Sequence, residues 1–282
     1  MMMITNQDNG IILLEFPKLA GFSGLVHGIF TRENGKSKGP YKSLNVGFGV
    51  GDDERTVLEN RKIISRRINA KDLVFLNQVH GKRIAIFEKE HDAYQMVGAD
   101  NYLQKEYSGN FEDHSDNLRF DSERRLEADA MITNISQKFL VIQTADCQSV
   151  LIYDPIQHVA ANVHCGWRGS INDIIGHTVT VMEQRFGCRA QDLIAGIGPS
   201  LGPCCAEFVH YKKEIPETFW QYKHKTNHFD FWSISRDQLC EKGVLAENVD
   251  VSRMCTKCET DRFFSFRGEG KTGRFANLIG LK

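Results

Sequence analysis

The sequence lacks the long apolar stretch that a membrane-spanning helix requires. No uninterrupted apolar run approaches the roughly 18–20 residues of such a span, and the opening residues, MMMITNQDNGIILLEF, contain neither a charged leader region nor a small-residue cleavage site. An excess of charge of one sign is also missing, because the formal net charge is −1. Binding dominated by a phosphate backbone usually needs a basic face. We therefore expect neither a membrane nor a nucleic acid as partner.

Linkers and internal repeats are absent as well. The 282 residues include only 6 prolines, and no Pro/Ser-rich segment divides the chain. Strands and helices are mixed without the regular alternation of a doubly wound fold. The favoured fold class is α+β, a mixed-sheet sandwich flanked by helices and formed as one domain over residues 1–282.

Several elements are predicted from local periodicity. Residues 53–68 predict a helix, because Val57, Ile64 and Ile68 recur at near-helical spacing behind an aspartate that can cap it. Three further helices and several strands are predicted, with KRIAIFE expected as the neighbour of LVFLNQVHG. The other predicted helices cover 171–186, 211–222 and 233–242, and the other strands include GLVHGIF, EADAMITN, KFLVIQTADCQSVLIYDP and HVAANVHCG.

Residues 88–125 stand apart from this pattern. The segment is polar, highly charged and nearly free of periodicity. A structureless loop of that length is uncommon inside a compact domain. We expect a polar insertion that is mobile or locally folded and covers part of the functional site.

Eight cysteines lie at positions 147, 165, 188, 204, 205, 240, 255 and 258. In a chain of this length with no export signal, reduced thiols or metal ligands are favoured over a disulfide framework, and a cytoplasmic location is expected. The CTKC motif at 255–258 has the spacing of half a structural zinc site or of a redox pair. The adjacent Cys204 and Cys205 make a poor second half. Ordinary thiols in a loop packed near the site are therefore the favoured interpretation.

Three strand ends each present a side chain that could bind zinc: His80 in NQVHG, Cys147 in QTADCQS and His164 in NVHCGWRG. Zinc binds imidazole nitrogen and thiolate sulfur, and a catalytic site usually has three protein ligands and one open position. Each residue alone could equally be a buried core side chain, since the long separations match no local metal motif. Cys165 competes with Cys147, but alternation along the strand predicts that it points away from His164.

Polar residues near these positions could assist the chemistry. Asp129 and Asp146 could move protons, or they could bind loop amides in a purely structural role. Four arginines lie in glycine-containing loops, where a guanidinium can bind phosphate or carboxylate in bidentate fashion. The arginines are Arg32, Arg168, Arg267 and Arg274. Arg168 could instead hold its own turn by bonding to backbone carbonyls.

Together these stretches resemble a known family. The matching motifs run in order from about residue 24 to the end, and the pair TADC and HCGWRG is the most specific of them. The others are HGIFTR, GPYKSLNVGFGVGDD, ENR, NQVHG, EADAMIT, GIGPSLGPCCAEF and FFSFRGEGKTGR. The chain resembles the laccase-domain proteins, described first as multicopper polyphenol oxidase-like and later as zinc-dependent purine nucleoside phosphorylases with adenosine deaminase activity.

The resemblance implies a layered α/β/β/α sandwich of mixed sheets and a zinc enzyme. His80, Cys147 and His164 correspond to the family's zinc ligands, and copper could occupy the same ligands. The implied substrates are phosphate and purine nucleosides of the adenosine, inosine, guanosine and methylthioadenosine class. A monomer or a homodimer is expected. The residues expected to act in catalysis are Asp129, Asp146 and Arg168, and those expected to bind substrate or phosphate are Arg32, Asn45, Arg267 and Arg274.

Three alternatives stay open at this point. A copper-dependent phenol oxidase would use the older family chemistry, although the 10 histidines include no HxH pair of the kind that multicopper clusters use. A metal-free hydrolase would use Cys147 as nucleophile with a histidine as base. A zinc-stabilised interaction protein would use the 88–125 segment to bind its partner.

Overall fold

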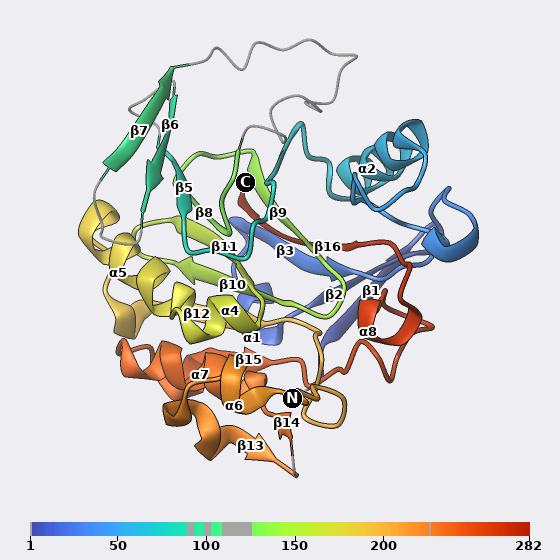
Figure 1. Cartoon of the computed structure of the whole chain (residues 1–282). Helices are drawn as coiled ribbons and strands as arrows, with labels where there is room; N and C mark the ends of the chain where they lie inside the picture. The colour runs from blue at the N-terminus through green and yellow to red at the C-terminus, as the bar shows by residue number, and fades with distance from the viewer. Residues whose placement is uncertain (1, 89–92, 99–102, 109–125, 226) are drawn as a thin grey trace.

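Two stacked β-sheets form the centre of the molecule (Figure 1). The computed structural model describes residues 2–88, 93–98, 103–108, 126–225 and 227–282. The six-stranded sheet has the order β1 (Ile4–Asp8), β2 (Ile11–Glu15), β3 (Leu25–Phe30), β16 (Phe275–Leu281), β9 (Lys138–Thr144) and β4 (Asp72–Phe75). The eight-stranded sheet has the order β15 (Val249–Val251), β12 (Ile194–Ile197), β10 (Gln148–Asp154), β11 (Val159–Cys165), β8 (Ala130–Thr133), β5 (Ile84–Phe87), β6 (Ala93–Val97) and β7 (Leu103–Ser108).

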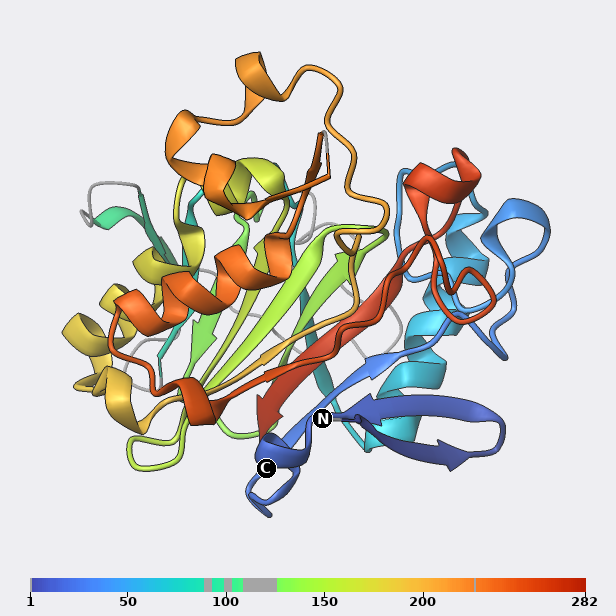
Figure 2. The same cartoon turned by 90° about the horizontal axis from the view of Figure 1, so that it is seen from below.

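Helices cover the outer faces of both sheets (Figure 2). Helix α2 (Glu54–Ile68) packs on the six-stranded sheet, where Ile64 joins a core cluster with Val141 and Leu278. Helices α5 (Ile174–Phe186) and α7 (Phe231–Glu241) pack on the eight-stranded sheet. Further short elements are α1 (Pro17–Ala20), α4 (Trp167–Ile171), α6 (Tyr211–Glu214), α8 (Phe266–Glu269) and the hairpin of β13 (Lys223–His224) with β14 (His228–Phe229). Short 3₁₀ helices cover Gly39–Tyr41, Ala190–Asp192, Glu217–Tyr222 and Ala246–Asn248.

Both sheets are mixed. The β4–β9, β5–β8 and β12–β15 pairs are parallel, and the other strand pairs in these two sheets are antiparallel. A core cluster lies between the sheets and includes buried residues from both, among them Ile142, Leu151 and Ile279. The predicted α+β class and its α/β/β/α layering are therefore confirmed. Among the described residues, no helix has the length and apolar character that crossing a bilayer requires.

The helix predicted over 53–68 is α2. The Asp53 side chain caps its first turn by accepting a hydrogen bond from the Thr56 amide at 2.9 Å. Its last turn ends at Asn69, whose backbone is left-handed with a φ of 52°. The cap and the apolar spacing that marked this helix in the sequence are the features that form it.

Two local predictions are wrong. The helix expected over 211–222 is interrupted: α6 ends at Glu214, and only a 3₁₀ helix covers Glu217–Tyr222. Pro216 explains the break, since a proline disfavours helical backbone at the residue before it. Strands β4 and β5, expected as neighbours, lie in different sheets because the chain crosses between the sheets after residue 75. Strands β9 and β10 are related in the same way.

The 88–125 segment is partly regular. Strands β6 and β7 extend the eight-stranded sheet by antiparallel pairing at one edge. Beside them, the His177 ring of α5 lies 3.0 Å from the Gly98 carbonyl oxygen. Residues 109–125 lie outside the described part of the chain.

Candidate functional site

His80, Cys147 and His164, here called the trio, converge at one point. Their potential ligand atoms all lie within 4.8 Å of one another. The Cys147 Sγ is 3.8 Å from His80 Nε2, and the two imidazole rings meet edge to face with centroids 4.9 Å apart. Nitrogen and sulfur ligands at about 2.0–2.3 Å from a tetrahedral metal would be separated by roughly 3.3–3.8 Å. The trio therefore fits a metal ion with three protein ligands.

The sheet crossings bring these residues together. His80 lies in the crossing from β4 to β5, and Cys147 lies in the crossing from β9 to β10, directly before β10. The Gln78 side chain joins the first crossing to the end of β9, donating to the Gln143 carbonyl and accepting from the Gln143 amide, both at 2.9 Å. His164 is the penultimate residue of β11, which pairs with β10.

Asp129 orients both histidines. Its carboxylate accepts hydrogen bonds from the His80 amide at 2.8 Å and the Gly81 amide at 2.6 Å, and it lies 2.8 Å from His164 Nδ1. Burial raises the pKa of Asp129, but the contacts with His164 and these amides outweigh it and hold the pKa below its ordinary value. With Nδ1 bonded to Asp129, Nε2 of His164 is left for a metal.

This geometry corrects the expected role of Asp129. The side chain is fully buried and does not line the cavity described below. These contacts favour the structural role over proton transfer to a substrate, so we assign Asp129 as a positioning residue for the two histidines.

The metal-free trio is strongly polarised. Burial raises the pKa of Cys147, but the hydrogen bond and charge of His164, followed by those of His80, lower it to about 6. Burial lowers the pKa of His164, but Asp129 and Cys147 raise it to about 9. At neutral pH Cys147 and His164 therefore form a thiolate–imidazolium pair, and the sulfur already carries the charge that a metal requires.

The residues after His164 explain the HCGWRG motif. A side chain at Gly166 would place its Cβ 3.0 Å from His80 Cδ2 and 3.1 Å from Cys147 Sγ, so any larger residue there would push against two members of the trio. Cys165 points away from the trio, as strand alternation predicts. Its sulfur lies 3.2 Å from Ser170 Oγ within the apolar core under α5, where burial raises its pKa to about 12.

The trio opens into a cavity of about 590 Å³, a size typical of small-molecule sites. Apart from Trp167 of the HCGWRG motif, sequence reasoning missed the aromatic side chains that line it, because nothing in their local spacing connects them. They are Phe48, Trp167, Phe208, Phe231 and Phe266. Phe266 is 60% exposed, which is unusual for a phenylalanine and leaves an apolar face available to a ligand.

Two of the four predicted arginines reach this cavity. Arg267 lines it from α8 and donates to the Glu207 carbonyl at 2.8 Å. Arg274 lines it just before β16 and donates to the Gly273 carbonyl at 2.9 Å. These two guanidinium groups give the cavity positive charge near the trio.

The other predicted substrate contacts lie elsewhere. Arg32 donates to the Thr260 carbonyl at 2.7 Å and to Glu269 at 2.8 Å, so it holds loops together and does not line the cavity. Asn45 is fully buried, where it donates to Asp52. Arg168 is exposed, stacks on the Trp167 ring and lies outside the cavity lining. The expectation that these three residues contact substrate is not supported.

Asp146 lines the cavity but is heavily engaged. Its Oδ1 accepts hydrogen bonds from Thr256 Oγ1 at 2.8 Å and Ser265 Oγ at 2.7 Å, and its Oδ2 accepts from the Arg267 amide at 2.6 Å. These bonds tie the loop before α8 to Asp146, which is the residue next to Cys147.

Strands β6 and β7 contribute nothing to the cavity lining, so the expected cover is wrong for the described part of the 88–125 segment.

Comparisons with known proteins agree with this architecture. The sequence pattern of the family described as multi-copper polyphenol oxidoreductase laccase matches residues 26–282. A purine nucleoside phosphorylase of Bacteroides thetaiotaomicron is 30% identical over 284 residues, covering 95% of each chain. The Escherichia coli purine nucleoside phosphorylase YfiH is 30% identical over 260 residues, covering 89% of this chain and 91% of its own.

A solved structure extends the likeness to the fold. The crystal structure of YlmD from Geobacillus stearothermophilus aligns with a TM-score of 0.80 at 28% identity, covering 99% of both chains. Because the family pattern spans most of the sequence and the fold agrees over nearly its whole length, the chain belongs to the multi-copper polyphenol oxidoreductase laccase family.

Proposed function

We propose that this protein is a zinc-dependent purine nucleoside phosphorylase with adenosine deaminase activity. The observation that carries the proposal is the open trio in the wall of a cavity that also contains aromatic rings and two guanidinium groups. The curated relatives named purine nucleoside phosphorylase support the same activity. The ligand set of two imidazoles and one thiolate suits zinc, and copper could compete for it.

Phosphorolysis transfers the ribose from the purine to phosphate through a transition state with positive charge on the sugar. The aromatic side chains would hold the purine by stacking, while Arg267 and Arg274 would hold the phosphate beside the ribose C1′. A phosphate oxygen then forms the new bond to C1′ as the bond to the purine nitrogen breaks. When bound at the trio, zinc supplies a Lewis acid at this wall of the cavity.

Deamination of adenosine in the same cavity requires water to add at the purine C6 and a group that accepts a proton from that water. The same group returns the proton to the amino group, which leaves as ammonia as the bond from C6 to nitrogen breaks. Asp146 is the acidic side chain among the described residues that line the cavity. Its Oδ2 accepts the Arg267 amide at 2.6 Å, and because a carboxylate oxygen has two lone pairs, an acceptor position is left on that oxygen. We therefore assign any proton transfer in the deaminase reaction to Asp146 and not to Asp129.

A second candidate function follows from the polarised pair. A thiolate at Cys147, an imidazolium at His164 and a buried Asp129 behind it are the arrangement of a metal-free cysteine hydrolase. A multicopper oxidase is less well supported. Among the described residues two groups of metal-ligating side chains converge, and neither contains more than two histidines.

One assay separates these functions. Purified protein with a measured zinc content is incubated with adenosine, inosine, guanosine and methylthioadenosine, each with and without phosphate, and the products are separated by chromatography. We expect free purine and a ribose phosphate only when phosphate is present, and loss of both when zinc is removed by chelation. Cleavage of inosine that is indifferent to phosphate would contradict the phosphorylase. Activity that survives chelation but not alkylation of Cys147 would favour the hydrolase.

A further inference from the structure

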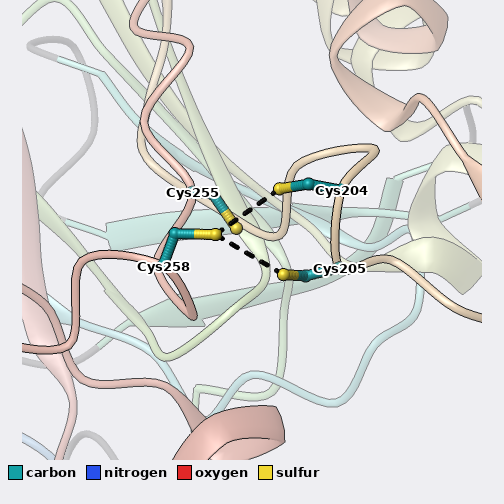
Figure 3. Close-up of side chains that lie close together, drawn as sticks. All are labelled: Cys204, Cys205, Cys255 and Cys258. Atoms are coloured by element: carbon teal, nitrogen blue, oxygen red, sulfur yellow. Dashed lines mark hydrogen bonds between the residues drawn. The ribbon is translucent and has the colours of Figure 1, made fainter.

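Four cysteines outside the cavity lining also converge: Cys204, Cys205, Cys255 and Cys258, here called the quartet (Figure 3). Their sulfur atoms all lie within 4.8 Å of one another. Cys204 and Cys205 belong to the loop after β12, and Cys255 and Cys258 belong to the loop after β15. The adjacent pair, expected to make a poor second half of a metal site, therefore faces the two cysteines of the CTKC motif.

The turn around Gly202 explains how adjacent cysteines can face the same point. The Gly202 carbonyl accepts hydrogen bonds from the amides of both Cys205 and Ala206 at 2.9 Å, which curls the chain through the pair. A Cβ at Gly202 would lie 2.6 Å from the Trp232 ring, so the tight packing of this turn requires glycine. The curled turn presents both sulfurs to the CTKC segment (Figure 3).

The spacing of the sulfur atoms matches a metal site and not disulfides. Cys258 Sγ lies 3.6 Å from the sulfur of Cys204 and 3.6 Å from that of Cys205. The edge of a tetrahedron with zinc–sulfur bonds of about 2.3 Å is about 3.8 Å, whereas a disulfide bond is about 2.05 Å long. All eight cysteines of the chain are unpaired thiols.

Packing does not account for the quartet. Cysteine is normally buried as a small apolar side chain, yet Cys204 and Cys258 are exposed and Cys205 is half-buried. Cys255 is the one buried member of the quartet. Exposed thiols gathered around a buried one are not explained by core packing, whereas a shared metal ion accounts for them.

We propose that the quartet is a second metal site of this protein, which binds zinc through four thiolates in a closed, structural coordination sphere. Two cysteines from each loop would then be cross-linked through one ion. The inference does not depend on the proposed phosphorylase activity, because it rests on residues that do not line the cavity.

The site would stabilise one wall of the cavity. Ser200 and Thr256, from the two quartet loops, are joined by a backbone hydrogen bond of 3.0 Å. Thr256 lies between the two CTKC cysteines and donates to Asp146 at 2.8 Å. Asp146 in turn holds the amide of Arg267. A metal in the quartet therefore fixes the loop segment that positions Asp146 and Arg267 at the cavity.

The first test counts metal ions in matched variants. Zinc per chain is measured by mass spectrometry of the metals in wild type, Cys258→Ser, Cys147→Ala and Cys240→Ser, the last replacing a half-buried thiol of α7 outside both groups. We expect two zinc ions in wild type and in Cys240→Ser, and one in each of the other variants. A wild-type chain with one zinc ion, which is lost in Cys147→Ala and kept in Cys258→Ser, would overturn the proposal.

A second test uses wild-type protein and does not require any variant to fold. Cysteine alkylation is followed by peptide mass spectrometry, with zinc bound and after chelation. We expect Cys204 and Cys258 to react only after zinc removal, despite their exposure. Equal alkylation in both states, or quartet peptides recovered as disulfides, would overturn the proposal. Neither test measures nucleoside cleavage, so failure of the phosphorylase assay would leave this result standing.

Discussion

The trio and the quartet are both groups of metal-ligating side chains, but their surroundings differ. The trio combines two imidazoles with one thiolate, lines a cavity of about 590 Å³ and is held from behind by a buried carboxylate. The quartet is all sulfur, lies outside that lining and joins two loops. Three protein ligands leave a coordination position for chemistry, whereas four thiolates fill a tetrahedron. The difference predicts that loss of the first abolishes activity and loss of the second lowers stability.

The largest effect should come from Cys147, for which Cys165 provides the control. Cys147→Ala removes a ligand, so we expect activity to fall at least about a thousandfold, well beyond the 10- to 100-fold that changes around a ligand cost. Cys165→Ala is the matched control, since its sulfur faces the core. It should keep metal and turnover and lower the free energy of unfolding by about 1 kcal/mol. Initial rates and zinc content of both variants give the answer, and equal losses would mean that the assigned ligand is wrong.

The next effect should separate stability from catalysis. Zinc held at about one hundred times its dissociation constant adds about 2.7 kcal/mol to the stability of the protein that binds it. Cys258→Ser should therefore lose about 3 kcal/mol in unfolding free energy measured with excess zinc, while Cys240→Ser should lose much less. The zinc of the trio should remain bound in both. Unchanged stability of Cys258→Ser would show that the quartet does not bind zinc in the folded protein.

A buried histidine that belongs to neither the trio nor the quartet provides a contrast with His164 that can be measured through the pH dependence of stability. His27 on β3 is almost completely buried and accepts the Phe16 amide at 2.9 Å, and burial lowers its pKa to about 4. Within the described ranges of the chain, no carboxylate contacts the His27 ring as Asp129 contacts His164, so His27 folds neutral. Between about pH 6.5, the ordinary pKa of histidine, and pH 4, the unfolded chain therefore binds a proton at His27 more readily than the folded protein does.

Stability should therefore be at its full value above about pH 6.5 and fall by roughly 3 kcal/mol as the pH drops to 4. His27→Gln, which keeps an acceptor for the Phe16 amide, should flatten this part of the profile. Denaturant unfolding at several pH values measures the slope. An unchanged slope in the variant would mean that other groups carry the acid sensitivity.

A smaller effect should follow from the carboxylate behind the trio. Asp129→Asn keeps the shape but removes the charge that orients His164, so metal affinity of the trio should fall about 10- to 100-fold. The quartet has no contact with Asp129 and should keep its zinc. Competition with a metal-binding dye can follow the two ions separately. Loss of both ions together would indicate general unfolding and not a positioning role.

The smallest effect concerns phosphate. Arg267→Ala removes a guanidinium from the cavity, and we expect the KM for phosphate to rise about tenfold, equivalent to about 1.4 kcal/mol. Arg168→Ala is the matched control because Arg168 is also exposed but does not line the cavity. Phosphate saturation curves with inosine distinguish them. An equal rise in both variants would contradict the assignment of Arg267.

Part of this picture could be predicted from the sequence. The cap and apolar spacing of α2 are local signals. Strand ends with metal-ligating side chains made His80, Cys147 and His164 candidates, and the family resemblance selected them as a set. Partner strands could not be predicted, since periodicity says which face is buried but not which strand lies beside it. The sheet crossings that separate β4 from β5 are for this reason visible only in the structure.

Long-range contacts explain the other failures. Arg32 has the same glycine-rich surroundings as Arg267, but distant carbonyls and Glu269 occupy its guanidinium. The quartet forms because two parallel strands, β12 and β15, lead into adjacent loops, and spacing rules for local zinc motifs do not describe that arrangement. Asp129 looked like a catalytic acid because its burial behind the histidines leaves no trace in the sequence.

Anomalous X-ray diffraction from zinc-loaded crystals, recorded on both sides of the zinc absorption edge, tests the central claim most directly. We predict two zinc peaks per chain. One should be bounded by His80, Cys147 and His164 with a position open to the cavity, and the other should be enclosed by Cys204, Cys205, Cys255 and Cys258. A map with no zinc peak at the trio, or with a fourth protein ligand closing it, would contradict the assignment of an open catalytic centre and a closed structural one.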